Sequence, residues 1–102
     1  MAELDPKVTH NHDRKQFEIN LDGQLALAAY RREGSTITFT HTEVPPEFEG
    51  RGIASKLIRS ALDEARDEKL KVVAQCEFVS GYIKRHPEYE TLTRDGRSSD
   101  DE

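Results

Sequence analysis

Hydrophobic and polar residues alternate through the first half of the chain, and turn signals separate the alternating runs. This alternation predicts β-strands with one face turned to a core, and Asp22-Gly23 and Glu33-Gly34 fit tight turns between them. Because Pro45 cannot donate to a β-ladder, we expect the fourth strand to end just before it. The four predicted strands cover about residues 7–11, 16–21, 25–32 and 36–44.

The fourth predicted strand divides its side chains between two faces. Ile37, Phe39, His41 and Glu43 share one face, whereas the threonines and Val44 share the other. The apolar face therefore continues into His41, near the C-terminal end of the strand.

The second half of the chain has helical periodicity. Its apolar positions recur with the spacing of an amphipathic helix at Ile53, Ala54, Leu57, Ile58, Ala61, Leu62 and Ala65. A short strand at residues 71–74 follows, and then a helix at about residues 78–85, with Phe78 on its apolar stripe and Pro87 stopping it at His86. The order β-β-β-β-α-β-α predicts an α/β domain (an α+β mixed sheet), with the fourth and fifth strands parallel.

Length and composition limit the domain organisation. The chain has 102 residues, a net charge of −5 and a mean hydropathy of −0.81, which suits one domain. We expect residues 1–6 to be flexible, residues 7–93 to form the domain and residues 94–102 to be a disordered acidic tail. Because no segment reads as a membrane span or a signal peptide, we expect a cytoplasmic protein without a membrane partner.

Composition also argues against several classes of site. With 15 basic and 20 acidic residues, the chain lacks the basic stripe of a nucleic-acid binder. The single cysteine, Cys76, permits neither an internal disulfide nor a four-cysteine zinc site. His10 and His12 lie beside Asp13, but a metal site there needs more ligands, so we expect no metal.

A glycine-rich turn, Gly50-Arg51-Gly52, precedes the long helix. The first amides of a helix have no intrahelical partners and lie at the positive end of its dipole, which suits a phosphate group. The turn could equally be a plain connection, and it matches neither the Walker loop nor the dinucleotide fingerprint.

The segment around this turn resembles the acetyl-CoA-binding motif of the GNAT acetyltransferase superfamily, written Q/R-x-x-G-x-G/A. The motif falls on residues 49–54, with Glu49 where the family usually has Gln or Arg. Residues 41–45, 76–78 and 82–89 match in order as well, so that residues 7–92 resemble the minimal stand-alone GNAT domains of the YjdJ type. The resemblance implies a reduced GNAT acyl-CoA N-acyltransferase fold.

The same resemblance implies how acetyl-CoA is held. Backbone amides of the turn bind the pyrophosphate, and the backbone of Val44 binds pantetheine by strand-like hydrogen bonds. The implied cofactor-binding residues are Val44, Glu49, Gly50, Arg51, Gly52, Ile53, Ala54 and Ser55.

Cys76 and His41 are the candidate catalytic residues. By position alone, Cys76 could be a reactive thiol at a helix start or a small core residue. His41 could likewise be a general base or fill the edge of the core. Since family members carry a cysteine and a histidine at these positions, the resemblance implies that both flank the acetyl group, on opposite lips of a cleft between the fourth and fifth strands. Cys76 would accept the acetyl group or line the acyl pocket.

The resemblance implies an N-acetyltransferase that moves an acetyl group from acetyl-CoA to an amine on a small molecule or a protein. A carboxylate cluster at Glu43, Glu47 and Glu49 could attract such an amine or could be solvated loop charge. Because a short chain leaves little room for an acceptor site, the alternative is a non-catalytic acyl-CoA-binding or protein-interaction module. We expect a monomer or a weak dimer.

Overall fold

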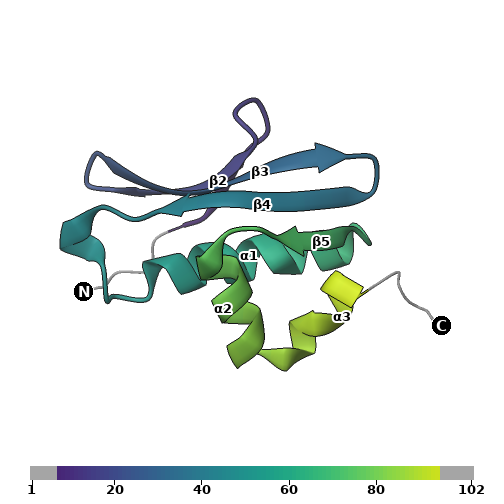
Figure 1. The fold of residues 1–102 in the computed structure, drawn as a ribbon. Coiled ribbons are helices and arrows are strands. Elements are labelled where there is room, and N and C mark those ends of the chain that lie inside the picture. The colour runs from purple at the N-terminus through teal and green to yellow at the C-terminus, as the bar shows by residue number, and fades with distance from the viewer. Residues whose placement is uncertain (1–6, 95–102) are drawn as a thin grey trace.

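The computed structural model describes residues 7–94, which form a five-stranded sheet with its helices on one side (Figure 1). The strands follow chain order: β1 (Thr9–Asn11), β2 (Gln16–Leu21), β3 (Gln24–Glu33), β4 (Thr36–Glu43) and β5 (Lys71–Ala74). Neighbouring strands are antiparallel except β4 and β5, which are parallel. The predicted mixed α/β fold and its parallel pair are confirmed. The flexible segment predicted at residues 1–6 lies outside the described residues, as does the predicted tail beyond Arg94.

Three helices and two short 3-10 helices complete the fold. They are η1 (Pro46–Phe48), α1 (Ile53–Asp67), α2 (Glu77–Arg85), η2 (Pro87–Tyr89) and α3 (Glu90–Arg94). The apolar stripe of α1 is buried as its spacing predicts, except that Ala54 is only half-buried. In α2, Phe78 was predicted on the buried stripe, but its side chain is 52% exposed, whereas Val79, Tyr82 and Ile83 are buried.

The core lies between α1 and the face of the sheet that the helices cover. Strands β2 and β3 contribute every second residue, from Phe17 to Leu21 and from Ala26 to Tyr30. Within residues 7–94, no helix covers the opposite face of the sheet (Figure 1). Along β2 and β3, the side chains that point to that face are exposed or half-buried, with few exceptions, and they alternate with the buried core residues. A sheet covered on one side produces this clean alternation.

A β-bulge in β4 changes the predicted faces of its last residues. Ala29 pairs with His41 and Tyr30 pairs with Phe39, so Thr40 is the extra residue on β4. Before the bulge Phe39 faces the core, but beyond it Thr42 is buried and His41 is exposed. The prediction that the apolar face continues into His41 is therefore wrong, because one inserted residue reverses the alternation.

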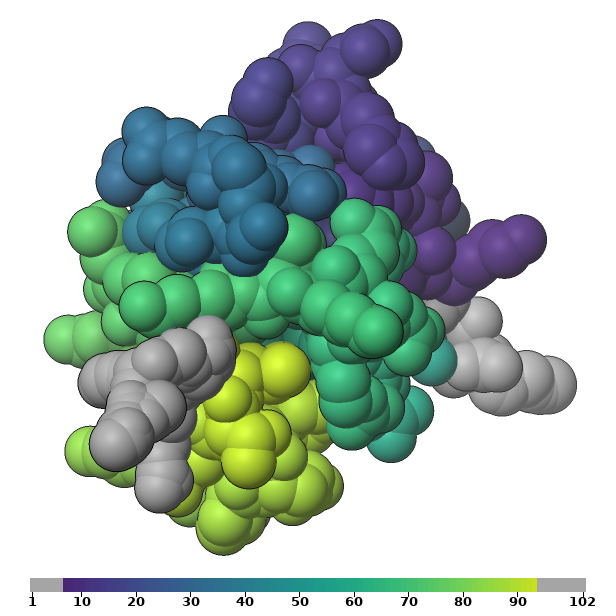
Figure 2. All heavy atoms as spheres, turned by 90° about the vertical axis from the view of Figure 1, so that its right-hand side faces the viewer, coloured from purple at the N-terminus to yellow at the C-terminus, as the bar shows by residue number. Residues whose placement is uncertain are grey.

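The C-terminal segment is fastened to α1 by Tyr89. Its hydroxyl donates a hydrogen bond of 2.6 Å to Asp63 Oδ1, and the Arg66 guanidinium lies 5.5 Å from the centre of its ring. Burial, helped by the hydrogen bond to Asp63, raises the pKa of Tyr89 to about 12 from its usual value of 10.0. Beyond Tyr89, α3 (yellow in Figure 2) packs against β5 (green).

We expect Tyr89→Phe to lower the free energy of unfolding by about 1 kcal/mol at neutral pH, since the variant loses this hydrogen bond. In the native protein the raised pKa favours the neutral phenol, so the stabilisation is complete below pH 10 and is lost as pH rises towards 12. Urea unfolding of both proteins at several pH values measures this difference. A gap that stays constant from neutral pH to pH 12 would contradict the assignment.

Candidate functional site

Cys76 lies where β5 gives way to α2. The amides of Gln75 and Cys76 both donate to the carbonyl oxygen of Phe39, each at 3.1 Å, and Cys76 is the N-cap residue of α2. Pairing between β4 and β5 ends at Phe39 and Ala74, whereas β4 continues to Glu43 with only β3 beside it. The two parallel strands therefore part at this point, immediately before the bulge.

The thiol of Cys76 contacts β4 beyond the bulge. Cys76 is 7% exposed, and its Sγ makes a hydrogen bond of 3.2 Å with Oγ1 of Thr42. A hydroxyl can accept from a thiol or donate to a thiolate, so Thr42 can serve either state. The sequence pattern placed Thr42 on the face opposite Phe39 and missed this contact, because the bulge turns Thr42 to the side of β4 that Phe39 faces.

His41 and Glu43 form a pair on the face of the sheet that the helices leave open. His41 Nε2 donates a hydrogen bond of 2.5 Å to Glu43 Oε2, and the two side chains are 57% and 61% exposed. Thr42 and the thiol lie on the helix-covered side of β4. The structure thus presents His41 and Cys76 on opposite sides of the same strand.

The glycine-rich turn has the backbone that its residues predict. Gly50 and Gly52 have φ values of +84° and +78°, which favour glycine, and Gly52 is the N-cap residue of α1. The bond from the Lys56 amide to the Gly52 carbonyl starts the helical series at 3.0 Å. Since Gly52 offers no side-chain cap and the first turn holds no acidic residue, its amides can receive an anion.

The segment between β4 and α1 is held by one side-chain contact within it and by one to β3. The Arg51 guanidinium lies 5.6 Å from the centre of the Phe48 ring, and Gln24 Nε2 donates to Glu47 at 2.5 Å. Gly50, Arg51, Gly52 and Glu49 are exposed, Val44, Ala54 and Ser55 are half-buried, and Ile53 is buried in the core. Because β4 and β5 run parallel, the turn after β4 and Cys76 after β5 lie towards the same end of the sheet.

A shallow hollow on α2 adds residues that the sequence pattern did not assign to a site. It is lined by Glu77, Phe78, Gly81 and Arg85. Exposure of Phe78 places an aromatic ring on this surface, two residues after Cys76. Because Phe78 is apolar and has helical spacing, the sequence pattern predicted that it is buried, and periodicity alone could not identify it as a surface residue.

The family model of the GCN5-related N-acetyltransferases matches residues 16–92, a range that contains the glycine-rich turn, the bulge and Cys76. The chain belongs to this GNAT family. GNAT proteins generally use acetyl-CoA. Within residues 7–94 of this GNAT protein, no helix is both long and apolar enough to span a membrane.

Relatives of this GNAT protein include Protein NATD1 of Xenopus tropicalis and of Mus musculus. Each is 37% identical over 91 residues, which cover 86% of this chain and 84% and 83% of the two relatives. The solution structure of a GCN5-like protein from Staphylococcus aureus matches with a TM-score of 0.68 at 24% identity, over 92% of this chain and 96% of that one. The structural match supports the reduced GNAT fold.

Proposed function

We propose that this GNAT protein transfers the acetyl group of acetyl-CoA to an amine and that Cys76 takes part in the transfer. The observation that carries the proposal is the contact between Cys76 Sγ and Thr42 Oγ1 where β4 and β5 part. The contact supports the proposal because the Cys76 thiol and its partner, the Thr42 hydroxyl, lie towards the same end of the sheet as the glycine-rich turn.

The turn and the start of α1 hold the phosphate groups of the cosubstrate. The amides of residues 50–55 donate to the pyrophosphate, and the Arg51 side chain adds positive charge at the exposed turn. The backbone of Val44, directly after β4, binds the pantetheine arm, and Phe78 and Arg85 border its path on α2. Glu49 contributes through its backbone, because its side chain is an anion.

Acetyl transfer proceeds by one of two routes that share these residues. In the covalent route the Cys76 thiolate attacks the acetyl carbonyl carbon, coenzyme A leaves as a thiolate that takes up a proton, and Thr42 donates a hydrogen bond to the cysteine thiolate. The acceptor amine then attacks the cysteine thioester and regenerates the thiol. In the direct route the amine attacks acetyl-CoA, and Cys76 lines the pocket and protonates the leaving thiolate.

His41 is the candidate general base for the acceptor amine. The Nε2 of His41 donates a hydrogen bond to Glu43, so Nδ1 is the ring nitrogen that can take a proton. Because His41 lies on the open face of the sheet and Cys76 on its helix-covered side, an acceptor that uses His41 has to reach the acetyl group around the part of β4 beyond Phe39, where β5 no longer pairs with it. The neighbouring carboxylates favour a cationic acceptor.

Intact-protein mass measurement after exposure to acetyl-CoA tests the proposal, together with release of coenzyme A across a panel of amines. Release that depends on an amine supports a transferase, and an added acetyl group mapped to Cys76 selects the covalent route. Tight binding of acetyl-CoA without release on any amine would instead favour the non-catalytic acyl-CoA-binding module.

We expect Gly52→Val to weaken acetyl-CoA binding. A β-branched residue disfavours the φ of +78°, so we expect the free variant to adopt another backbone conformation here, and a cost of about 1.4 kcal/mol to restore the binding conformation weakens binding roughly tenfold. Gly34→Val is the matched control, because Gly34 has a φ of +60° in the turn between β3 and β4, away from the site. Calorimetric titration with acetyl-CoA measures both, and equal loss in the two variants would argue against a specific role for Gly52.

A further inference from the structure

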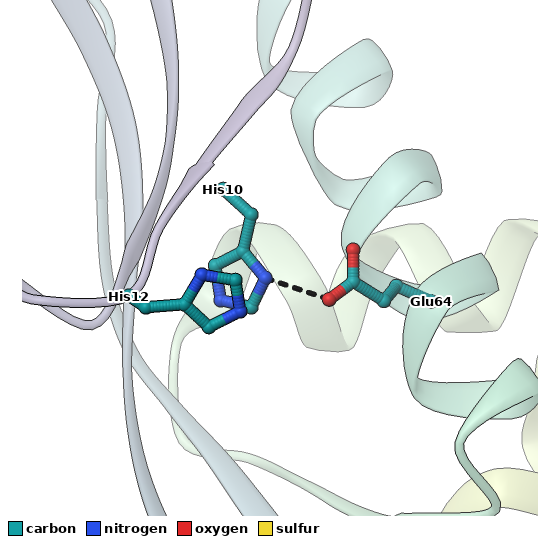
Figure 3. A group of neighbouring side chains, drawn as sticks. All are labelled: His10, His12 and Glu64. Atoms are coloured by element: carbon teal, nitrogen blue, oxygen red, sulfur yellow. Dashed lines mark hydrogen bonds and ion pairs between the residues drawn. The ribbon is translucent and has the colours of Figure 1, made fainter.

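A second group of chemically able side chains lies away from the glycine-rich turn. His10 in β1, His12 just after it and Glu64 in the C-terminal half of α1 come together beneath the sheet (Figure 3). One ligand atom from each residue lies within 4.8 Å of the others. Positions 10 and 12 are two residues apart at the end of a strand, so both imidazoles leave the chain on the same side. The third member, Glu64, is 54 positions after His10 in the sequence.

His10 is held in one orientation by contacts on both ring nitrogens. Its Nδ1 lies 2.6 Å from Glu64 Oε2, and its Nε2 lies 2.5 Å from the Tyr30 hydroxyl. The ring stacks on Phe17 at 4.1 Å and on His12 at 3.8 Å, and its side chain is 15% exposed. Metal-binding histidines are characteristically fixed in this way, with one nitrogen bonded to a neighbour so that the other is aimed at the ion.

We propose that His10 Nδ1, His12 and Glu64 bind one zinc ion, with water as the fourth ligand. Two imidazoles and a carboxylate are a donor set that zinc accepts, whereas magnesium and calcium prefer oxygen ligands. When zinc binds Nδ1, the proton that Nδ1 shares with Glu64 Oε2 moves to Nε2 or is released to water, so the bound His10 ring carries one proton, on Nε2, and donates it to the Tyr30 hydroxyl. In a tetrahedral site these two ligand atoms are about 3.4 Å apart, so they separate by less than 1 Å from the hydrogen-bonded distance.

His12 is the ligand whose side chain has to move when zinc binds. Its ring is exposed and stacked on His10, so it must turn out of the stack to aim a nitrogen at the ion. Exposure makes this rotation cheap, because no core contact has to break. Glu64, with a side chain that is 35% exposed, lies at the surface on the other side and leaves the fourth position open to water.

The zinc ion would tie β1 to α1. Within residues 7–94, β1 is the shortest strand, with three residues, and it is an edge strand that pairs with β2, so an added link to α1 should stabilise its position. A bond through the ion joins it to the longest helix, at the end of α1 opposite the glycine-rich turn. The site is therefore separate from the proposed acetyl-CoA site and acts on stability.

Titration of the tag-free protein with zinc chloride tests this inference, with the melting temperature and calorimetric binding as readouts. We expect one ion per chain and a rise in melting temperature that depends on zinc concentration. Cobalt chloride is the spectroscopic probe, since cobalt bound tetrahedrally by nitrogen and oxygen has visible bands. A charge-transfer band from sulfur would place the ion at Cys76 and overturn the proposal.

His12→Ala is the decisive variant, because His12 is exposed and its removal leaves the core intact. We expect it to weaken zinc binding by at least roughly tenfold, and Glu64→Gln to do the same with little change in shape. His41→Ala, which removes an exposed histidine outside the group, is the control and should bind zinc as the native protein does. Equal affinity in the native protein, His12→Ala and Glu64→Gln would overturn the site, as would the absence of any zinc-dependent stabilisation.

Discussion

A Cys76→Ala variant is expected to keep its fold and to lose acetyl transfer by about a hundredfold or more. The substitution removes the thiol that would attack the acetyl group in the covalent route or protonate the leaving thiolate in the direct one. Its structural cost is small, because alanine fits the buried position and only the hydrogen bond to Thr42 is lost. The measurement is the rate of coenzyme A release with an amine that the native protein accepts.

Two companion variants separate chemistry from packing. Cys76→Ser keeps a hydrogen-bonding group beside Thr42 but removes the nucleophilic thiol, so it should be nearly as slow as the alanine variant. Thr42→Val preserves the shape beside Cys76 without the hydroxyl and should reduce the rate by a smaller factor. Circular dichroism establishes that each variant is folded. A Cys76→Ala protein with native turnover would remove this residue from the mechanism.

Phe39→Ala is expected to lower the free energy of unfolding by about 3–5 kcal/mol, the usual effect of removing a buried aromatic ring. Phe39 is 1% exposed and packs edge-on against Tyr30 with 6.2 Å between ring centres. It also lies at the last pair between β4 and β5, where its carbonyl oxygen holds the amides of Gln75 and Cys76. A cavity at this position therefore loosens the backbone that presents the thiol.

Urea denaturation measures the effect, with Phe48→Ala as the matched control. Phe48 is the same residue type but is half-buried in the loop before α1, so its removal should cost much less stability. Phe39→Leu should fall between the native protein and Phe39→Ala, because it retains most of the buried volume. A loss below about 1 kcal/mol for Phe39→Ala would mean that this ring is not part of the central packing.

Regular alternation and helical spacing predicted the strands and the two main helices of this fold. Strands β2 and β5 have the predicted bounds, and α1 has the predicted buried stripe, since nothing interrupts the repeat in these segments. The η1, η2 and α3 elements are too short to show a period and were missed. Phe78 was placed in the core because an apolar residue at helical spacing is normally buried, yet it is exposed.

The candidate site was predictable only in part. Gly50 and Gly52 could be predicted because their backbone has positive φ angles, a conformation for which glycine is the usual residue. The bulge at Thr40 has no such marker, since neither glycine nor proline occurs in β4. The contact between His10 and Glu64 joins residues 54 positions apart, and no local pattern can indicate that distance.

The bulge also divides β4 into positions that evolution can treat differently. Thr42 touches Cys76 on the helix-covered side of β4, whereas His41 and Glu43 are exposed on the open side. Exchange of Glu43 would therefore change the charge offered to an acceptor without a change beside Cys76, whereas exchange of His41 would also remove the candidate general base. For protein engineering, Glu43 is therefore the position to randomise first when a new acceptor is sought.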